Sequence, residues 1–132
     1  MIKVYIASPY TKGNKLENVN LQLDAANELL IRGYAPYTPL LTHYQHIRHP
    51  RDEHDWLKLD NEFLACCDMF IRIKPIKDGK EISSFGADGE EALAKKLCIP
   101  VFVFHTIEEL ILFLEENDFI KDGDTIIKRS KE

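Results

Sequence analysis

The fold is decided by residues 69–104, which read MFIRI at 69–73, SSFGADGEEALAKKL at 83–97 and IPVFVF at 99–104. The first and last pieces are short, β-branched and aromatic, which is typical of buried strands. The middle piece joins a strand end to a helix that is predicted over residues 87–97. A strand, a helix and another strand at this spacing imply parallel neighbours in one sheet.

The rest of the chain shows the same alternation. The predicted strands span residues 3–7, 34–37, 69–73 and 101–104, and the predicted helices span residues 18–32, 52–67, 87–97 and a last helix from residue 106. We therefore expect a flavodoxin-like, doubly wound α/β fold, with a mostly parallel sheet of four to five strands and helices on both faces. The expected strand order is 2-1-3-4, and a fifth strand would be an edge strand at residues 125–128.

Local signals support the individual helices. Gly33 follows the first helix where a left-handed cap would lie, and Thr106 with Glu109 forms a capping box. The helix over residues 52–67 is predicted to bury one face, which carries Trp56, Leu59, Phe63 and Cys66. Residues 40–50 show no such pattern, and we expect an irregular loop there.

Composition limits the class of protein. With 132 residues, 45% hydrophobic and 30% charged, the chain suits one globular domain over residues 1–132. Its net charge of −5 argues against a nucleic-acid polymer as partner, because phosphate-binding surfaces are basic. The three cysteines form no C-x-x-C pair, which favours reduced, buried thiols over disulfides or a zinc ribbon. Since no signal peptide and no apolar run of about 18 residues is present, we expect a cytoplasmic protein without membrane contact.

The stretch best suited to chemistry is residues 83–94, at the turn from a strand into a helix. Backbone N–H groups at a helix start attract anions. Ser84 can cap the helix or bind a ligand oxygen, and Gly86 permits close backbone approach. Glu90, predicted in the first turn, would be kept ionised by the positive helix end, as a carboxylate nucleophile requires. The alternative is an ordinary surface helix with an acidic first turn.

A second carboxylate, Asp60, lies one helical turn after Trp56. On the predicted helix it would lie near the cleft at the strand ends. Two carboxylates about 5 Å apart, one a nucleophile and one an acid, are the arrangement for retaining cleavage of a glycosidic bond. The alternative for Asp60 is a solvated helix residue.

Two further groups of residues allow more than one interpretation. The histidines between residues 43 and 54 lack the spacing of a metal motif. Their segment is either a plain polar loop or one that covers a substrate through Tyr44, His46 or Arg48. Five basic residues could supply positive charge for a phosphate, or could simply be solvated surface residues. They are Lys12, Arg72, Lys74, Lys77 and Lys80.

Four short motifs occur in order over roughly residues 3–104. They are Tyr5-Ile6-Ala7-Ser8-Pro9, Asp60 with Cys67-Asp68, Ser84-x-Gly86-x-x-x-Glu90-x-x-x-Ala94, and Ile99-Pro100-Val101. Each motif is weak alone, but the ordered set resembles the nucleoside 2-deoxyribosyltransferase-like superfamily. That superfamily includes the deoxynucleoside 5′-monophosphate N-glycosidases.

The resemblance implies a role for each matching residue. Glu90 would attack the anomeric carbon, Asp60 would assist departure of the base, and Tyr5 would orient Glu90. The implied substrate-binding residues are Ser8, Pro9, Ser84, Gly86 and Asp88. Ser84 would contact the 5′ end of the substrate, whereas Ser8 stands where many members carry glycine, so the contacts of its loop stay open. The resemblance implies neither a metal nor an organic cofactor.

The activity implied by the resemblance is cleavage of the N-glycosidic bond of a (deoxy)nucleoside or its 5′-monophosphate. A glycosyl-enzyme intermediate on Glu90 would form, with water or another base as acceptor, so hydrolase and transferase both stay open. The alternative is a non-catalytic nucleotide-binding or sensing module of the same fold. The partner would be a small nucleoside or nucleotide, and the family implies a homodimer or larger homo-oligomer. The basic tail at residues 128–132 would then contact a phosphate across the dimer interface, which favours a nucleotide hydrolase.

Overall fold

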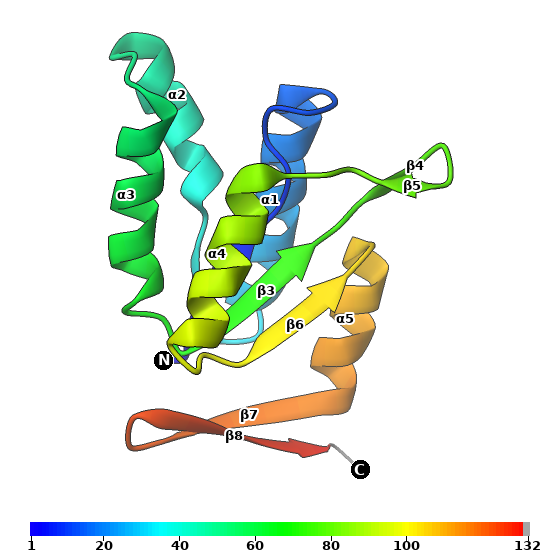
Figure 1. Ribbon diagram of the computed structural model, residues 1–132. Coiled ribbons are helices and arrows are strands. Elements are labelled where there is room, and N and C mark those ends of the chain that lie inside the picture. The colour runs from blue at the N-terminus through cyan, green and yellow to red at the C-terminus, as the bar shows by residue number, and fades with distance from the viewer. Residues whose placement is uncertain (131–132) are drawn as a thin grey trace.

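The computed structural model describes residues 1–130, and its centre is a four-stranded parallel sheet (Figure 1). The strands are β1 (Lys3–Ala7), β2 (Ala35–Tyr37), β3 (Met69–Ile73) and β6 (Val101–Phe104), in the order β2-β1-β3-β6. Each neighbouring pair is parallel, and Tyr5 of β1 lies between Tyr37 and Phe70 in register. The predicted flavodoxin-like order is confirmed, because β6 is the fourth strand of the prediction.

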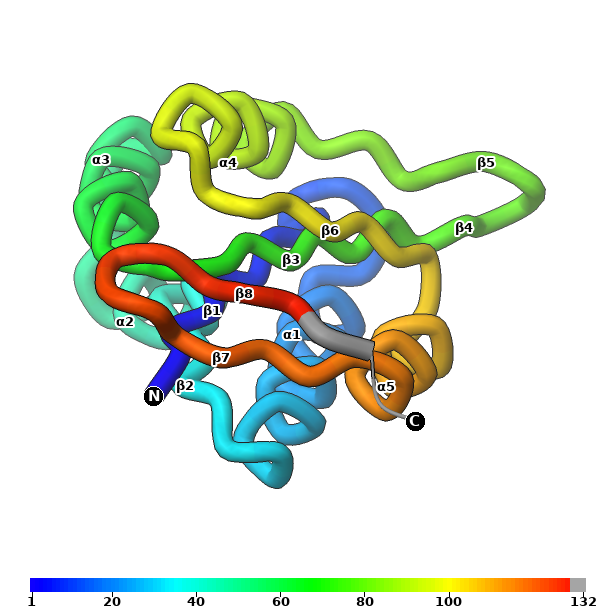
Figure 2. Tube along the Cα trace, turned by 90° about the horizontal axis from the view of Figure 1, so that it is seen from below, coloured from blue at the N-terminus to red at the C-terminus, as the bar shows by residue number. Residues whose placement is uncertain are grey.

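Helices cover both faces of this sheet (Figure 2). On one face lie α1 (Lys15–Leu30) and α5 (Ile107–Glu116), and on the other lie α3 (Glu53–Leu64) and α4 (Phe85–Lys96). Successive strand residues point to opposite faces. Val4 and Ile6 therefore join the core beneath α1 and α5, while Tyr5 and Ala7 join a second core beneath α3 and α4. Burial on both faces explains why the central strands are nearly continuous apolar runs.

Capping residues determine where the helices begin and end. The Ser84 hydroxyl accepts a hydrogen bond from the Ala87 N–H at 3.1 Å, and α4 therefore starts at Phe85, two residues before its predicted start. Thr106 caps α5 as predicted. Gly33 has a φ of +88° at the end of α1, which confirms the predicted left-handed cap.

The prediction of an irregular loop over residues 40–50 is wrong. A short 3₁₀ turn, η1 (Pro39–Leu41), leads directly into the helix α2 (Thr42–Arg48). No residue of α2 is buried. Its sequence therefore carries no apolar period from which a helix could be recognised.

The predicted core face of α3 is also wrong. The buried residues of this helix are Asp60 and Leu64, whereas Leu59 and Phe63 are exposed, and Cys66 just after the helix is exposed too. The helix is turned so that the Asp60 carboxylate faces the interior together with Leu64, while Leu59 and Phe63 face outward.

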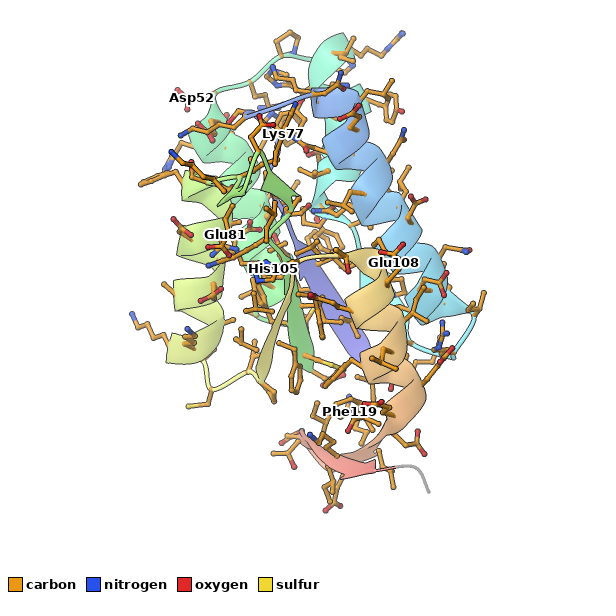
Figure 3. The ribbon with its side chains drawn as sticks, turned by 90° about the vertical axis from the view of Figure 1, so that its right-hand side faces the viewer. Asp52, Lys77, Glu81, His105, Glu108 and Phe119 are labelled. Carbon is orange, nitrogen blue, oxygen red and sulfur yellow. The ribbon has the colours of Figure 1, made fainter. Side chains whose placement is uncertain are left out.

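Two antiparallel hairpins extend the fold beyond the predicted elements. They are β4 (Ile76–Lys77) with β5 (Lys80–Glu81), and β7 (Asn117–Asp122) with β8 (Thr125–Ser130). The first hairpin projects from the end of β3, and the second lies across the opposite end of the sheet (Figures 1 and 2). Figure 3 labels one residue of each, Lys77 in the first and Phe119 in the second. Lys121 of β7 forms an ion pair with Asp68, just before β3, at 3.3 Å. The expected edge strand at residues 125–128 thus pairs with β7 instead of the sheet, and residues 131 and 132 of the basic tail lie outside the described residues.

Two expectations from composition can be compared with the structure. Within residues 1–130, no helix combines the length and the apolar character needed to cross a membrane. The three cysteines are free, but Cys66 and Cys98 are exposed, so the expectation of buried thiols is wrong for these two.

Candidate active site

A cavity of about 310 Å³ opens between the loop after β1 and the helices α1, α2, α3 and α4. It lies beyond the carboxyl ends of the parallel strands, where ligands bind in doubly wound sheets. Both carboxylates singled out from the sequence, Asp60 of α3 and Glu90 of α4, line it. The fold therefore brings together two residues that are thirty positions apart in the chain.

Among residues 1–130, Glu90 is held by one hydrogen bond, from a well-packed tyrosine. The Tyr5 hydroxyl donates a hydrogen bond to Glu90 Oε2. Tyr5 itself is fully buried, and its ring stacks on Phe70 with 5.6 Å between the ring centroids. Because the tyrosine ring is fixed by the second core, its hydroxyl fixes the direction in which the Glu90 carboxyl points. Tyr5 lies beneath the cavity and is not part of its lining.

The ionisation of Glu90 differs from the prediction. Glu90 is only 8% exposed, and burial raises the pKa of its carboxyl to about 8. The helix dipole does not offset this, because α4 starts at Phe85 and Glu90 falls in the second turn, beyond the reach of the dipole. The expectation that the helix end keeps Glu90 ionised is therefore wrong. The Tyr5 hydrogen bond acts in the opposite direction from burial, since a donor to a carboxylate favours its charged form.

Asp60 is in a similar environment on the neighbouring helix α3. It is 7% exposed, and burial raises the pKa of its carboxyl to about 7, although a hydrogen bond from Tyr37 opposes the shift. The Tyr37 hydroxyl donates to Asp60 Oδ1 at 3.3 Å. Burial and the neighbouring Asp60 also raise the pKa of Tyr37, which therefore stays protonated as a donor. Each cavity carboxylate thus has its own tyrosine as a partner, fully buried Tyr5 for Glu90 and half-buried Tyr37 for Asp60.

Of the other residues expected to bind substrate, some line the cavity and others do not. Ser8, Ser84 and Gly86 line the cavity, whereas Pro9 and Asp88 do not. The Ser8 hydroxyl accepts a hydrogen bond from Gln22 Nε2 at 3.0 Å. The Ser84 oxygen accepts from the backbone of α4, so its own proton can be given to a ligand. Asp88 is exposed and forms an ion pair with Arg72, away from the cavity.

Of the three residues considered for a substrate-covering loop, His46 lines the cavity, whereas Tyr44 and Arg48 do not. Tyr10, His43 and Trp56 also line it and were not assigned to a site from the sequence. Tyr10 contacts His43 through a hydrogen bond between its hydroxyl and Nδ1. Trp56 donates from its indole nitrogen to His46 Nδ1 at 2.8 Å. These contacts hold α2 against the loop after β1 and against α3. Trp56, which was predicted to be a core residue, instead forms part of the cavity wall. The dense His and aromatic content of residues 43–56 was the signal that could have indicated this.

The cations of the cavity are also not those first considered. Lys15 and Arg51 line it, but none of the five candidates named from the sequence does. Lys12 instead donates to the Ser83 hydroxyl at 2.8 Å, and Arg72 is buried beneath α4. Among residues 1–130, no group of three or more His, Cys, Asp or Glu side chains is arranged to hold a metal ion.

Comparison with known proteins supports the fold. No protein-family model and no curated protein matches the sequence. Among solved structures, the chain is similar to a 2-deoxyribosyltransferase from the psychrotolerant bacterium Bacillus psychrosaccharolyticus, with a TM-score of 0.52 and 22% sequence identity. The match covers 91% of this chain and 86% of that chain. At this level of identity the likeness is one of fold, and it agrees with the fold that the four sequence motifs implied.

Proposed function

We propose that this protein cleaves the N-glycosidic bond of a (deoxy)nucleoside or its 5′-monophosphate. One observation carries the proposal: two buried carboxylates, Glu90 and Asp60, line one cavity at the carboxyl end of the sheet. Desolvated carboxylates with raised pKa values are unfavourable in a folded protein and are found mainly at functional sites. The fold likeness to a 2-deoxyribosyltransferase is consistent with glycosidic chemistry.

Glu90 and Asp60 would divide the chemistry between them. The Glu90 carboxylate attacks the anomeric carbon as the bond from that carbon to the base nitrogen breaks. Asp60, whose pKa burial raises to about 7, gives its proton to the departing base. Because burial raises the pKa of Glu90 further, to about 8, the reactive form with Glu90 ionised and Asp60 protonated is a minor fraction near neutral pH. The product is a free base and a sugar ester of Glu90, which Tyr5 holds in its attacking orientation.

The second half of the reaction regenerates both carboxyl groups. Water attacks the anomeric carbon, the ester bond to Glu90 breaks, and the proton from water returns to Asp60. The net result is hydrolysis. If a second base takes the place of water, its N–H proton goes to Asp60 and the net result is transfer. Both outcomes use the same residues, and the acceptor decides between them.

A substrate with a 5′-phosphate suits the charges of the cavity. Lys15 and Arg51 provide two cations, and the first turn of α4 presents its backbone N–H groups with the Ser84 hydroxyl beside them. A helix N-terminus with a free hydroxyl is a common site for phosphate. These features favour a nucleotide over a nucleoside. The aromatic and imidazole side chains on the α2 side would then lie against the base.

The test is release of free base, followed by chromatography, from a panel of deoxy- and ribonucleosides and their 5′-monophosphates. Reactions run with and without a second base, using the wild type, Glu90→Ala and, as a matched control, Glu62→Ala on the exposed side of α3. We expect release that is lost in Glu90→Ala and kept in Glu62→Ala. Dependence on the added base would identify a transferase.

Two outcomes would contradict the proposal. Release that continues in Glu90→Ala would exclude this residue as the nucleophile. Binding of nucleotides without release of base from any member of the panel would favour a non-catalytic sensing module instead. Isothermal calorimetry with the same panel supplies the binding measurement.

A further inference from the structure

A buried arginine lies beneath the helix that carries Glu90. Arg72 of β3 is 3% exposed, and its guanidinium contacts two acidic residues of α4. One terminal nitrogen lies 2.6 Å from Asp88 Oδ1, and the other lies 3.3 Å from Glu91 Oε1. These ion pairs join the sheet to the first two turns of α4.

The two acidic residues flank Glu90 on the helix but point elsewhere. An α-helix turns by about 100° per residue, so Asp88 and Glu91, three positions apart, share one side of α4. Glu90 is about 200° from Asp88 and projects into the cavity toward Tyr5. A contact that holds the Asp88 side of the helix therefore also sets where Glu90 points.

Stability alone is a poor explanation for Arg72. Its Nε is buried and has no hydrogen-bond partner among the described residues. A buried ion pair often contributes no more to stability than an apolar side chain of similar size, and a buried unsatisfied donor is unfavourable. The position lies in a sheet whose neighbouring core residues, Ala7 and Phe70, are apolar. An apolar side chain would fit the same environment without desolvating a charge.

We propose that Arg72 is a positioning residue for the Glu90 nucleophile. By holding Asp88 and Glu91 it fixes the rotation of α4 about its axis, and so keeps the Glu90 carboxyl against Tyr5. The activity it serves rests on the proposed function, but the positioning itself does not. Glu91 stays charged for this contact, because hydrogen bonds and charge from Lys95 and Arg72 hold its pKa below the usual range, against the effect of partial burial.

The experiment weakens the contact at the acidic partners, exposed Asp88 and half-buried Glu91, and leaves the buried Arg72 in place. Asp88→Asn and Glu91→Gln each remove one charge facing Arg72. Lys95→Gln is the control, because it removes the other ion pair of Glu91, at 2.9 Å, without touching Arg72. Asp88→Glu keeps the negative charge that Asp88→Asn removes. The measurements are the pKa of Glu90 by ¹³C NMR of labelled glutamate, and kcat and KM for base release.

The expected result is selective. Asp88→Asn and Glu91→Gln should each lower kcat roughly tenfold with KM changed less than about twofold, since a small misplacement of a reacting group acts on the chemical step. The Glu90 pKa, measured at high salt so that the direct effect of the removed negative charge is screened, should fall by about half a unit or more as the carboxyl gains solvent. Lys95→Gln should change neither quantity, and Asp88→Glu should recover most of the kcat.

Two results would overturn the inference. An unchanged Glu90 pKa together with an unchanged kcat in both variants would show that Arg72 does not position the nucleophile. A raised KM with constant kcat in Asp88→Asn would mean that Asp88 contacts the substrate instead. If the wild type releases no base at all, the proposed function fails, and the NMR titration alone decides the positioning role.

Discussion

Replacing Glu90 by glutamine should stabilise the protein, and the gain should grow as the pH rises. Burial raises the pKa of this carboxyl from 4.5 to about 8. A group with a raised folded-state pKa favours folding while it is protonated. That contribution is fully present below the unfolded pKa of 4.5 and is lost as the pH rises through about 8. Glutamine resembles the protonated acid, keeps an acceptor for Tyr5, and does not titrate.

The size of the effect follows from the two pKa values. One pKa unit corresponds to about 1.4 kcal/mol, so a shift from 4.5 to about 8 amounts to roughly 5 kcal/mol once titration is complete. Between about pH 5 and pH 9, the free energy of unfolding of Glu90→Gln should therefore rise by roughly 4 kcal/mol relative to the wild type. The Tyr5 hydrogen bond reduces this figure, because it favours the carboxylate. A rise of about 2 kcal/mol is still measurable by denaturant unfolding.

The assay is urea unfolding at a series of pH values, followed through the fluorescence of Trp56, the one tryptophan of the chain. Glu62→Gln, at an exposed position of α3, is the matched control and should differ from the wild type by a constant amount. The same constant difference for Glu90→Gln would mean that Glu90 titrates like an exposed carboxyl. The argument that its burial raises the pKa would then be refuted.

Three further predictions concern activity, each measured as base release. The profile of kcat/KM against pH should be bell-shaped with apparent pKa values near 7 and 8, because the reaction needs Asp60 protonated and Glu90 ionised. The form with both properties is most abundant between these two values, and a flat profile would contradict the two roles. Tyr5→Phe should lower kcat roughly tenfold or more through loss of a hydrogen bond to a charged group, and full activity would exclude the orienting role. Lys15→Ala and Arg51→Ala should each raise KM roughly tenfold for a 5′-monophosphate but not for the nucleoside, and equal effects on both substrates would exclude phosphate contact.

The sheet could be predicted because its strands carry strong local signals. The apolar runs at Met69–Ile73 and Val101–Phe104 are buried in the interior of a parallel sheet, and their sequences reflect that burial directly. Helix α2 (Thr42–Arg48) carries no such signal, because none of its residues is buried. It is held by contacts to distant residues, such as the one from His46 to Trp56. Contacts of this kind do not appear as a period in the sequence.

The two cavity carboxylates could be named from the sequence, but their ionisation could not. Glu90 and Asp60 were identified by their place near strand ends and by the family motifs. Their pKa values depend on burial, which is a property of tertiary packing rather than of sequence spacing. For the same reason the cations of the cavity, Lys15 and Arg51, could not be told apart from surface residues of the same type.

The buried face of α3, which differs from the sequence prediction, supports the proposed site. An amphipathic helix of this sequence would be expected to bury Leu59 and Phe63, yet it buries Asp60 and exposes both apolar residues. That orientation leaves apolar area in water and desolvates a carboxylate, and both effects are unfavourable. The same conflict recurs at Glu90 on α4 and at Arg72 beneath it. Conflicts of this kind between local preference and fold are expected at functional sites, and their grouping in and under one cavity supports the proposed site.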